Sequence, residues 1–63
     1  MKVIYAIKTK NGYKFIAKRH DDTIPARSKE LGRVDDIDVH LMLEWCYEEF
    51  RKGRTIDQIK RGF

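Results

Sequence analysis

Residues 35–53 read DDIDVHLMLEWCYEEFRKG, and this stretch decides the fold. Along it, apolar side chains recur at helical spacing: Val39, Met42, Leu43, Cys46 and Phe50. The short acidic residues that precede them are typical of a helix start, because their carboxylates accept from free N–H groups and offset the positive end of the helix dipole. Gly53 ends the pattern directly after two basic residues. The sequence therefore predicts a long amphipathic helix over residues 36–52.

Upstream of this helix, two β-rich runs flank Asn11-Gly12 and predict a hairpin over residues 2–19. We expect a loop of three residues, Lys10 to Gly12, because this register separates apolar from charged side chains. One face is then mostly apolar and is the face that the long helix should cover: Val3, Tyr5, Ile7, Tyr13, Phe15 and Ala17. The opposite face carries lysines around a small apolar strip: Lys2, Lys8, Lys14 and Lys18 around Ile4, Ala6 and Ile16.

The remaining segments complete an α+β fold. Residues 20–34 have no sustained period and are expected to form a loop, with a short third strand around Gly32 to Val34 as an alternative. Thr55 and Gln58 match a capping box and predict a second, short helix over residues 55–62. The predicted architecture is a β-hairpin, with or without a third strand, packed by one long helix and followed by the short one. A chain of 63 residues can bury only one small core, so residues 1–63 are expected to form a single domain.

Several classes of function find no support in the composition. Cys46 is the only cysteine, which excludes an intrachain disulfide and a cysteine-based zinc site, and its place in the apolar stripe predicts a buried, inert thiol. The first apolar run is only five residues long, Val3 to Ile7, too short for a signal peptide or a membrane span, so we expect a cytoplasmic protein without a membrane partner. No phosphate loop, carboxylate pair or metal-ligand cluster is legible, so we expect no enzyme activity, no cofactor and no metal.

Charge is divided along the chain. Residues 1–33 carry nine Lys and Arg against three Asp and Glu, residues 35–49 carry six acidic residues and no basic one, and residues 51–63 carry five basic residues against one acidic. Such segregation is typical of a binding surface, because summed charge governs encounter and partner choice.

The leading hypothesis is a small, non-enzymatic, nucleic-acid-associated regulatory protein that contacts the phosphates of DNA or RNA, consistent with the sequence pI of about 9.4. Its expected contacts are the basic hairpin face and the basic tail: Lys2, Lys8, Lys14, Lys18, Arg51, Lys52, Arg54, Lys60 and Arg61. The alternative is a modulator of the phage or mobile-element type that binds a larger host protein or complex through its acidic helix, by Glu44, Glu48 and Glu49. A further alternative is a self-associating structural protein, for example a homodimer in which acidic helix meets basic hairpin.

Overall fold

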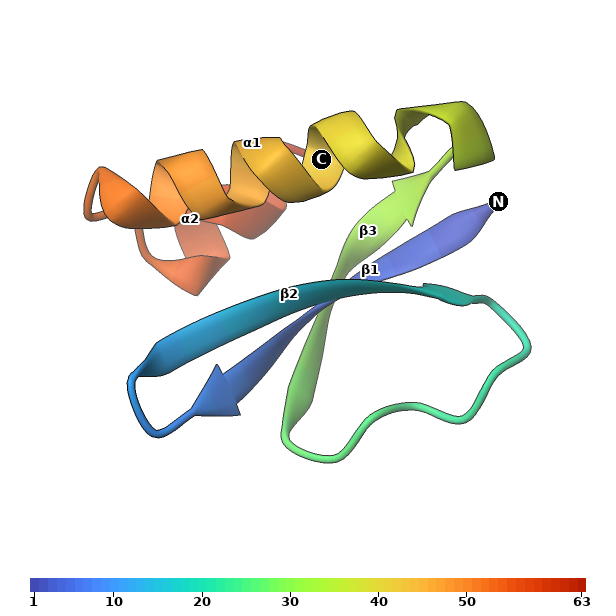
Figure 1. The fold of residues 1–63 in the computed structure, drawn as a ribbon, viewed down its shortest axis with the longest axis horizontal. Helices are drawn as coiled ribbons and strands as arrows, with labels where there is room; N and C mark the ends of the chain where they lie inside the picture. Colours follow the sequence, from blue (N-terminus) through green and yellow to red (C-terminus); the bar gives the residue numbers. More distant parts are fainter.

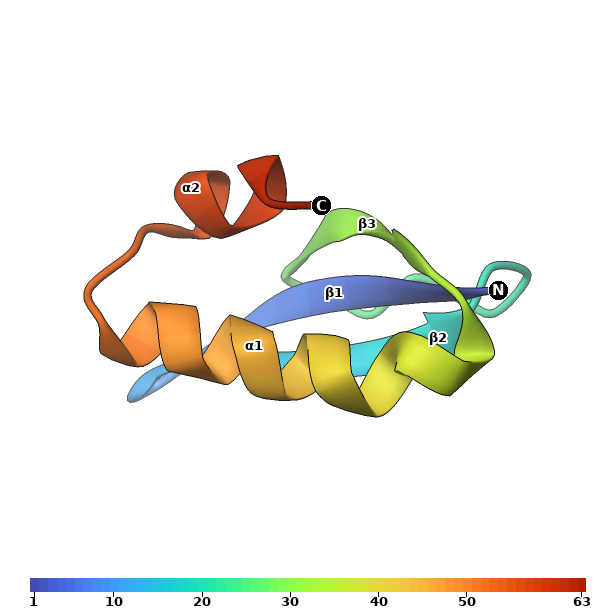
Figure 2. The ribbon, with the colours of Figure 1, turned by 90° about the horizontal axis from the view of Figure 1, so that it is seen from above.

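The computed structural model describes all residues, 1–63. Three strands, a short 3-10 segment and two α-helices follow one another along the chain: β1 (Lys2–Thr9), β2 (Gly12–Arg19), β3 (Ser28–Val34), η1 (Asp36–Asp38), α1 (Val39–Arg51) and α2 (Ile56–Arg61). The strands form one antiparallel sheet in the order β2-β1-β3, so β1 lies in the centre. Both helices lie on one side of the sheet, α1 over β2 and α2 over β3 (Figures 1 and 2). The predicted α+β class is confirmed.

The hairpin has the expected extent but a different register. Thr9 lies opposite Gly12 and Ala6 opposite Phe15, so the loop contains two residues, Lys10 and Asn11. The predicted loop of three residues is therefore wrong. Gly12 adopts a φ of 139°, which side-chain-bearing residues rarely reach, and this explains why glycine follows the loop.

The register changes which face of β1 meets the helices. Ile4 and Ala6, predicted to face outward, lie in the core with Phe15, whereas Val3 and Tyr5 lie on the other face. The four lysines predicted to share one platform are consequently split. Lys2 and Lys8 lie on the helix side of the sheet, and Lys14 and Lys18 lie on the opposite side, across from Ile7 and Val3.

The path of the segment between β2 and β3 helps to explain why the apolar pattern of β1 predicted the wrong hairpin register. Both strands run antiparallel to β1, so residues 20–27 must travel the length of the sheet to join them, and they do so on the side away from the helices (Figure 1). On that side Val3 and Tyr5 are only 2% and 5% exposed. Buried on both faces, β1 reads as a continuous apolar run with no alternation to read.

The rest of the predicted loop is a strand. Residues 28–34, part of the stretch expected to be loop, form β3, which confirms and lengthens the third strand considered as an alternative. The pairing of β3 with β1 shifts between Ile4 and Tyr5, which leaves Leu31 as the extra residue of a bulge. Leu31 is buried in the core.

The core lies between the sheet and the two helices. It joins residues from all three strands and both α-helices: Ile4, Ala6, Phe15, Leu31, Val34, Cys46, Ile56 and Ile59. Tyr47 packs its ring edge-on against Phe15, with centroids 5.0 Å apart. Its hydroxyl accepts a hydrogen bond from the backbone N–H of Phe15 at 3.1 Å and lies 3.4 Å from the carbonyl oxygen of the same residue. The predicted burial of Cys46 is confirmed, and burial raises the pKa of its thiol to about 11.

The helix termini differ in how they are capped. The predicted helix over residues 36–52 is present as η1 followed by α1, but neither Asp35 nor Asp38 accepts a capping hydrogen bond through its side chain. The expectation that these carboxylates cap free N–H groups is wrong. At α2 the capping box is confirmed, because the Thr55 hydroxyl accepts from the Gln58 N–H and the Gln58 side chain accepts from the Thr55 N–H. No helix in the structure is long and apolar enough to cross a bilayer.

Candidate anion-binding groove

A groove of about 920 Å³ opens at one end of the molecule, where the hairpin turn, the start of β3 and the link between α1 and α2 meet. Four basic side chains line it: Lys8, Lys10, Arg27 and Lys29. Its only acidic lining residue is Asp57. Cations that converge on one concave surface with few opposing charges create a positive field that attracts anions.

The wall of the groove is aromatic and apolar. Tyr13 and Phe50 both line it, with ring centroids 5.7 Å apart in an edge-to-face arrangement. Ala6 and Ile56 supply the rest of the apolar lining. A Cβ atom at position 12 would lie 3.3 Å from the Phe50 ring, so Gly12 also allows Phe50 to approach the hairpin closely. The groove thus combines cations with aromatic rings, and proteins that bind single-stranded nucleic acids commonly have both features.

The backbone around Arg27 holds the groove together on the β3 side. Arg27 is the only non-glycine residue with a positive φ, 57°. Its carbonyl oxygen accepts a hydrogen bond from the N–H of Lys8 at 3.3 Å. The Ser28 hydroxyl donates to the carbonyl oxygen of Pro25 at 2.5 Å. These bonds fix the turn that enters β3 and thereby place Arg27 next to the hairpin.

One cation of the groove is already neutralised. The Lys29 ammonium donates a hydrogen bond to the Asp57 carboxylate and forms an ion pair with it. This hydrogen bond, reinforced by the positive charge of Lys29, lowers the pKa of Asp57 below its ordinary value. Asp57 therefore stays ionised and competes with any anion for Lys29.

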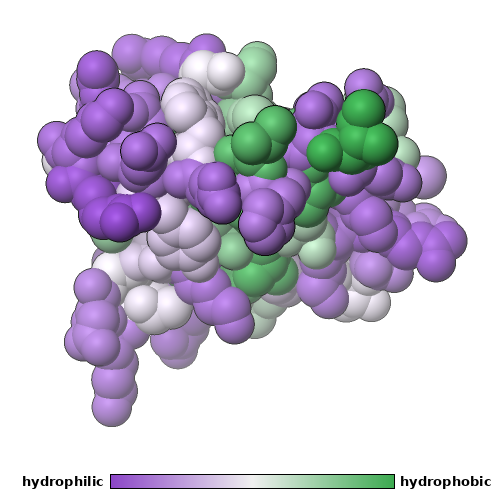
Figure 3. Space-filling view, turned by 45° about the horizontal axis from the view of Figure 1, so that its top comes forward, coloured by the Kyte–Doolittle hydropathy of each residue, from purple (hydrophilic) through white to green (hydrophobic).

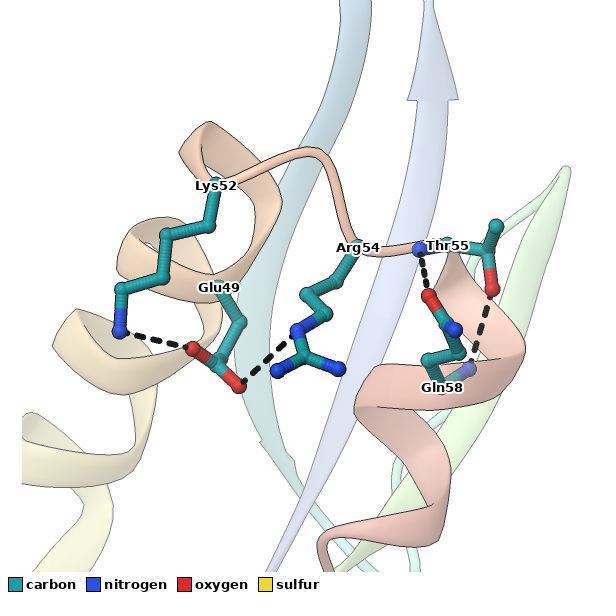
Figure 4. Close-up of polar contacts among 5 residues, drawn as sticks. All are labelled: Glu49, Lys52, Arg54, Thr55 and Gln58. Carbon is teal, nitrogen blue, oxygen red and sulfur yellow. Dashed lines mark hydrogen bonds and ion pairs between the residues drawn. The ribbon is translucent and has the colours of Figure 1, made fainter.

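Two more cations lie on the link between α1 and α2, in the chain between the lining residues Phe50 and Thr55 (Figure 4). Lys52 and Arg54 both approach the Glu49 carboxylate, at 3.3 Å and 4.0 Å. The backbone N–H of Arg54 also donates to the carbonyl oxygen of Glu49 at 3.2 Å. With its side chain only 17% exposed, Glu49 serves to close the link between the helices. Lys52 and Arg54 are thus partly compensated within the chain.

The structure brings together only some of the basic residues singled out from the sequence. Lys8 lines the groove, whereas Lys52 and Arg54 lie on the link between α1 and α2, next to lining residues in the chain. The others do not line it: Lys2, Lys14, Lys18, Arg51, Lys60 and Arg61. Three lining cations were left out of that set, namely Lys10, Arg27 and Lys29. The only sequence feature that could have pointed to these three residues is the excess of basic residues in positions 1–33, to which they belong.

The acidic residues proposed for partner binding are also unequal. Glu44 lies 3.5 Å from His40, one helical turn earlier, and both are well exposed. Glu48 is exposed on α1. Because Glu49 is occupied by Lys52 and Arg54, only Glu44 and Glu48 present free acidic surface from this set.

The chain matches no protein-family model, no curated protein and no solved structure.

Proposed function

We propose that this protein is a small, non-enzymatic, nucleic-acid-associated regulator that binds the phosphate backbone of DNA or RNA in the groove between the hairpin turn, β3 and α2. The observation that carries the proposal is the convergence of Lys8, Lys10 and Arg27 on a concave surface whose only carboxylate is already paired. Lysine and arginine bind phosphates and release counterions from the polyanion, which makes such binding favourable at low salt.

The groove favours a single strand over a duplex. Tyr13 and Phe50 lie among the cations, and a base that is not paired in a helix can lie against an aromatic ring while its phosphates contact lysines. A duplex hides its bases, so it would use only the cations. The ligand class we propose is therefore single-stranded DNA or RNA, bound with little sequence preference.

The basic residues outside the groove have a secondary role in this proposal. Lys52 and Arg54 both lie near Glu49, so they would add to the positive field without contacting phosphates directly. Lys60 and Arg61 are exposed in the last turn of α2 and would add to the positive field. Lys14 and Lys18 lie on the opposite side of the sheet and cannot contact the same stretch of ligand as Lys8.

The decisive experiment compares binding of labelled single-stranded DNA, single-stranded RNA and duplex DNA, by fluorescence anisotropy, from low to physiological salt. We expect both single strands to bind more tightly than the duplex and all binding to weaken as salt rises. The Tyr13→Ala variant should lose the preference for single strands while keeping the salt dependence. Absence of binding at low salt would overturn the proposal.

The second candidate function is that of a protein-binding modulator acting through the acidic side of α1. The exposed carboxylates of Glu44 and Glu48 favour it, although Glu49 does not contribute. If this candidate is right, charge reversal at Glu44 and Glu48 should abolish binding to the partner protein and leave nucleic-acid binding intact. Self-association of acidic helix with basic hairpin would instead appear as a concentration-dependent mass in sedimentation.

A further inference from the structure

We propose that η1 and the first turn of α1 form a docking surface for a second protein, whose contacting segment carries apolar side chains flanked by Lys and Arg. This surface is separate from the groove. It lies at the opposite end of α1, a helix of 13 residues, which places it about 20 Å along the helix axis from the link that borders the groove.

The centre of the surface is apolar and uncovered. Ile37 is 88% exposed and Leu41 is 65% exposed. Residues four apart on a helical segment are neighbours, so these two side chains form one patch. Leu41 also lines a hollow of about 380 Å³ together with Met1, Val34 and Met42. Figure 3 shows hydrophobic surface between hydrophilic regions on the side of the molecule where α1 begins. Neighbouring apolar side chains that are exposed and rimmed by polar residues are typical of an interaction site.

The rim of the surface is acidic, and its carboxylates are not used by the fold. Asp35 and Asp38 line the hollow together with one cation, Arg33, yet neither carboxylate caps the helix that follows it. Asp36 lies 3.6 Å from the Met1 amino group, and both groups are well exposed. An exposed ion pair of this kind contributes little to stability. The carboxylates are therefore free to meet cations of a partner.

The sign of the rim decides which occupant fits. Two copies of this surface facing each other across a two-fold axis would bring two sets of three carboxylates together, with only Arg33 and the Met1 amino group of each copy to offset them, so the contact would keep an unfavourable net negative charge. A head-to-tail contact with the basic groove of a second copy would bury that groove and would build rings or open chains of molecules. A different protein with a basic and apolar segment avoids both difficulties, because its cations complement Asp35, Asp36 and Asp38 while its apolar side chains cover Ile37 and Leu41.

The test uses an amphipathic helical peptide with a leucine stripe and a lysine face, and a control peptide in which glutamate replaces lysine. We expect the lysine peptide to bind the full chain and to shift the backbone amide NMR signals of residues 35–42, and the glutamate peptide not to bind. The double variant Ile37→Ser/Leu41→Ser should weaken binding by about tenfold or more, since it removes two apolar contacts from the interface. Both side chains are exposed, so the variant should remain folded.

A matched control separates this surface from the groove. The double variant Lys8→Gln/Lys10→Gln, which alters only groove residues, should bind the lysine peptide as the unmodified chain does. The proposal is wrong if the peptide fails to bind, if its shifts map outside residues 35–42, or if Ile37→Ser/Leu41→Ser leaves its affinity unchanged. It is also wrong if the chain sediments as an oligomer that this variant converts to a monomer, because the occupant is then a second copy. These outcomes do not depend on the groove, so they test the docking surface even if the protein binds no nucleic acid.

Discussion

Neutralising two groove lysines should lower the salt dependence of nucleic-acid binding by an amount that the structure sets. The groove holds four cations, of which Lys29 is paired with Asp57, so three are free to contact phosphates. For a single strand each phosphate contact contributes about −0.7 to the slope of log K against log salt, which gives a slope of about −2 for three contacts. Between about 50 and about 200 mM salt, affinity should then fall about 18-fold.

The double variant Lys8→Gln/Lys10→Gln leaves one free cation, so its slope should be about −0.7 and its affinity should fall only about 3-fold over the same range. The Asp57→Asn variant should act in the opposite direction. It releases Lys29, so four contacts become available, the slope steepens to about −2.8 and binding at low salt tightens. Fluorescence anisotropy with a labelled oligonucleotide at several salt concentrations measures all three slopes.

A matched control has the same change in net charge outside the groove. Lys14 and Lys18 both lie on the opposite side of the sheet and neither lines the groove, so Lys14→Gln/Lys18→Gln should keep the slope near −2, about that of the unmodified chain. If this control lowers the slope as much as Lys8→Gln/Lys10→Gln does, binding follows net charge and not the groove. If Asp57→Asn weakens binding, the reasoning about Lys29 is refuted.

Further predictions concern the core and the contacts around it. Burial raises the pKa of the Cys46 thiol from an ordinary 9.0 to about 11, so between pH 9 and pH 11 unfolding releases a proton. The free energy of unfolding should therefore fall by about 2–3 kcal/mol as pH rises through this range. Urea titrations at several pH values should show this loss for the unmodified chain and not for Cys46→Ala. Lys29→Gln should raise the pKa of Asp57 toward its ordinary value, which carboxyl-carbon NMR can follow. In the unmodified chain the lowered pKa of Asp57 stabilises the fold at pH values above the ordinary pKa of an Asp carboxyl. This stabilisation should be lost as pH falls through the lowered pKa. Gly62→Ala would place a Cβ against the Trp45 ring and should destabilise the chain by about 1–3 kcal/mol with a change in Trp45 fluorescence, whereas an unaltered spectrum would contradict the packing.

The helices could be predicted from the sequence because their signals are local. The apolar spacing before Gly53 and the pair Thr55 and Gln58 specify where each helix runs without reference to other segments. The hairpin register could not be obtained in this way. Assigning apolar residues to a single covered face assumes that the other face meets water, and this assumption fails because Val3 and Tyr5, on the face away from the helices, are buried as well.

The groove was less predictable than the fold. Its cations come from the hairpin and from the turn that enters β3, and its aromatic wall joins Tyr13 to Phe50, which is 37 positions later in the chain. Composition indicated that the first 33 residues are basic, but only the register decides which lysines face the same side. The pairing of Lys29 with Asp57 likewise depends on α2 lying over β3, a contact that no local pattern encodes.

The Tyr47 hydroxyl has a consequence for behaviour at high concentration. β2 is an outer strand of the sheet, and an outer strand normally offers unpaired N–H and C=O groups to which another chain can add. At Phe15, in the middle of β2, both groups instead face one phenol from α1. An incoming strand would have to displace that side chain and its ring contact before it could pair. The helix that builds the core therefore also protects the sheet against growth into fibrils along this side.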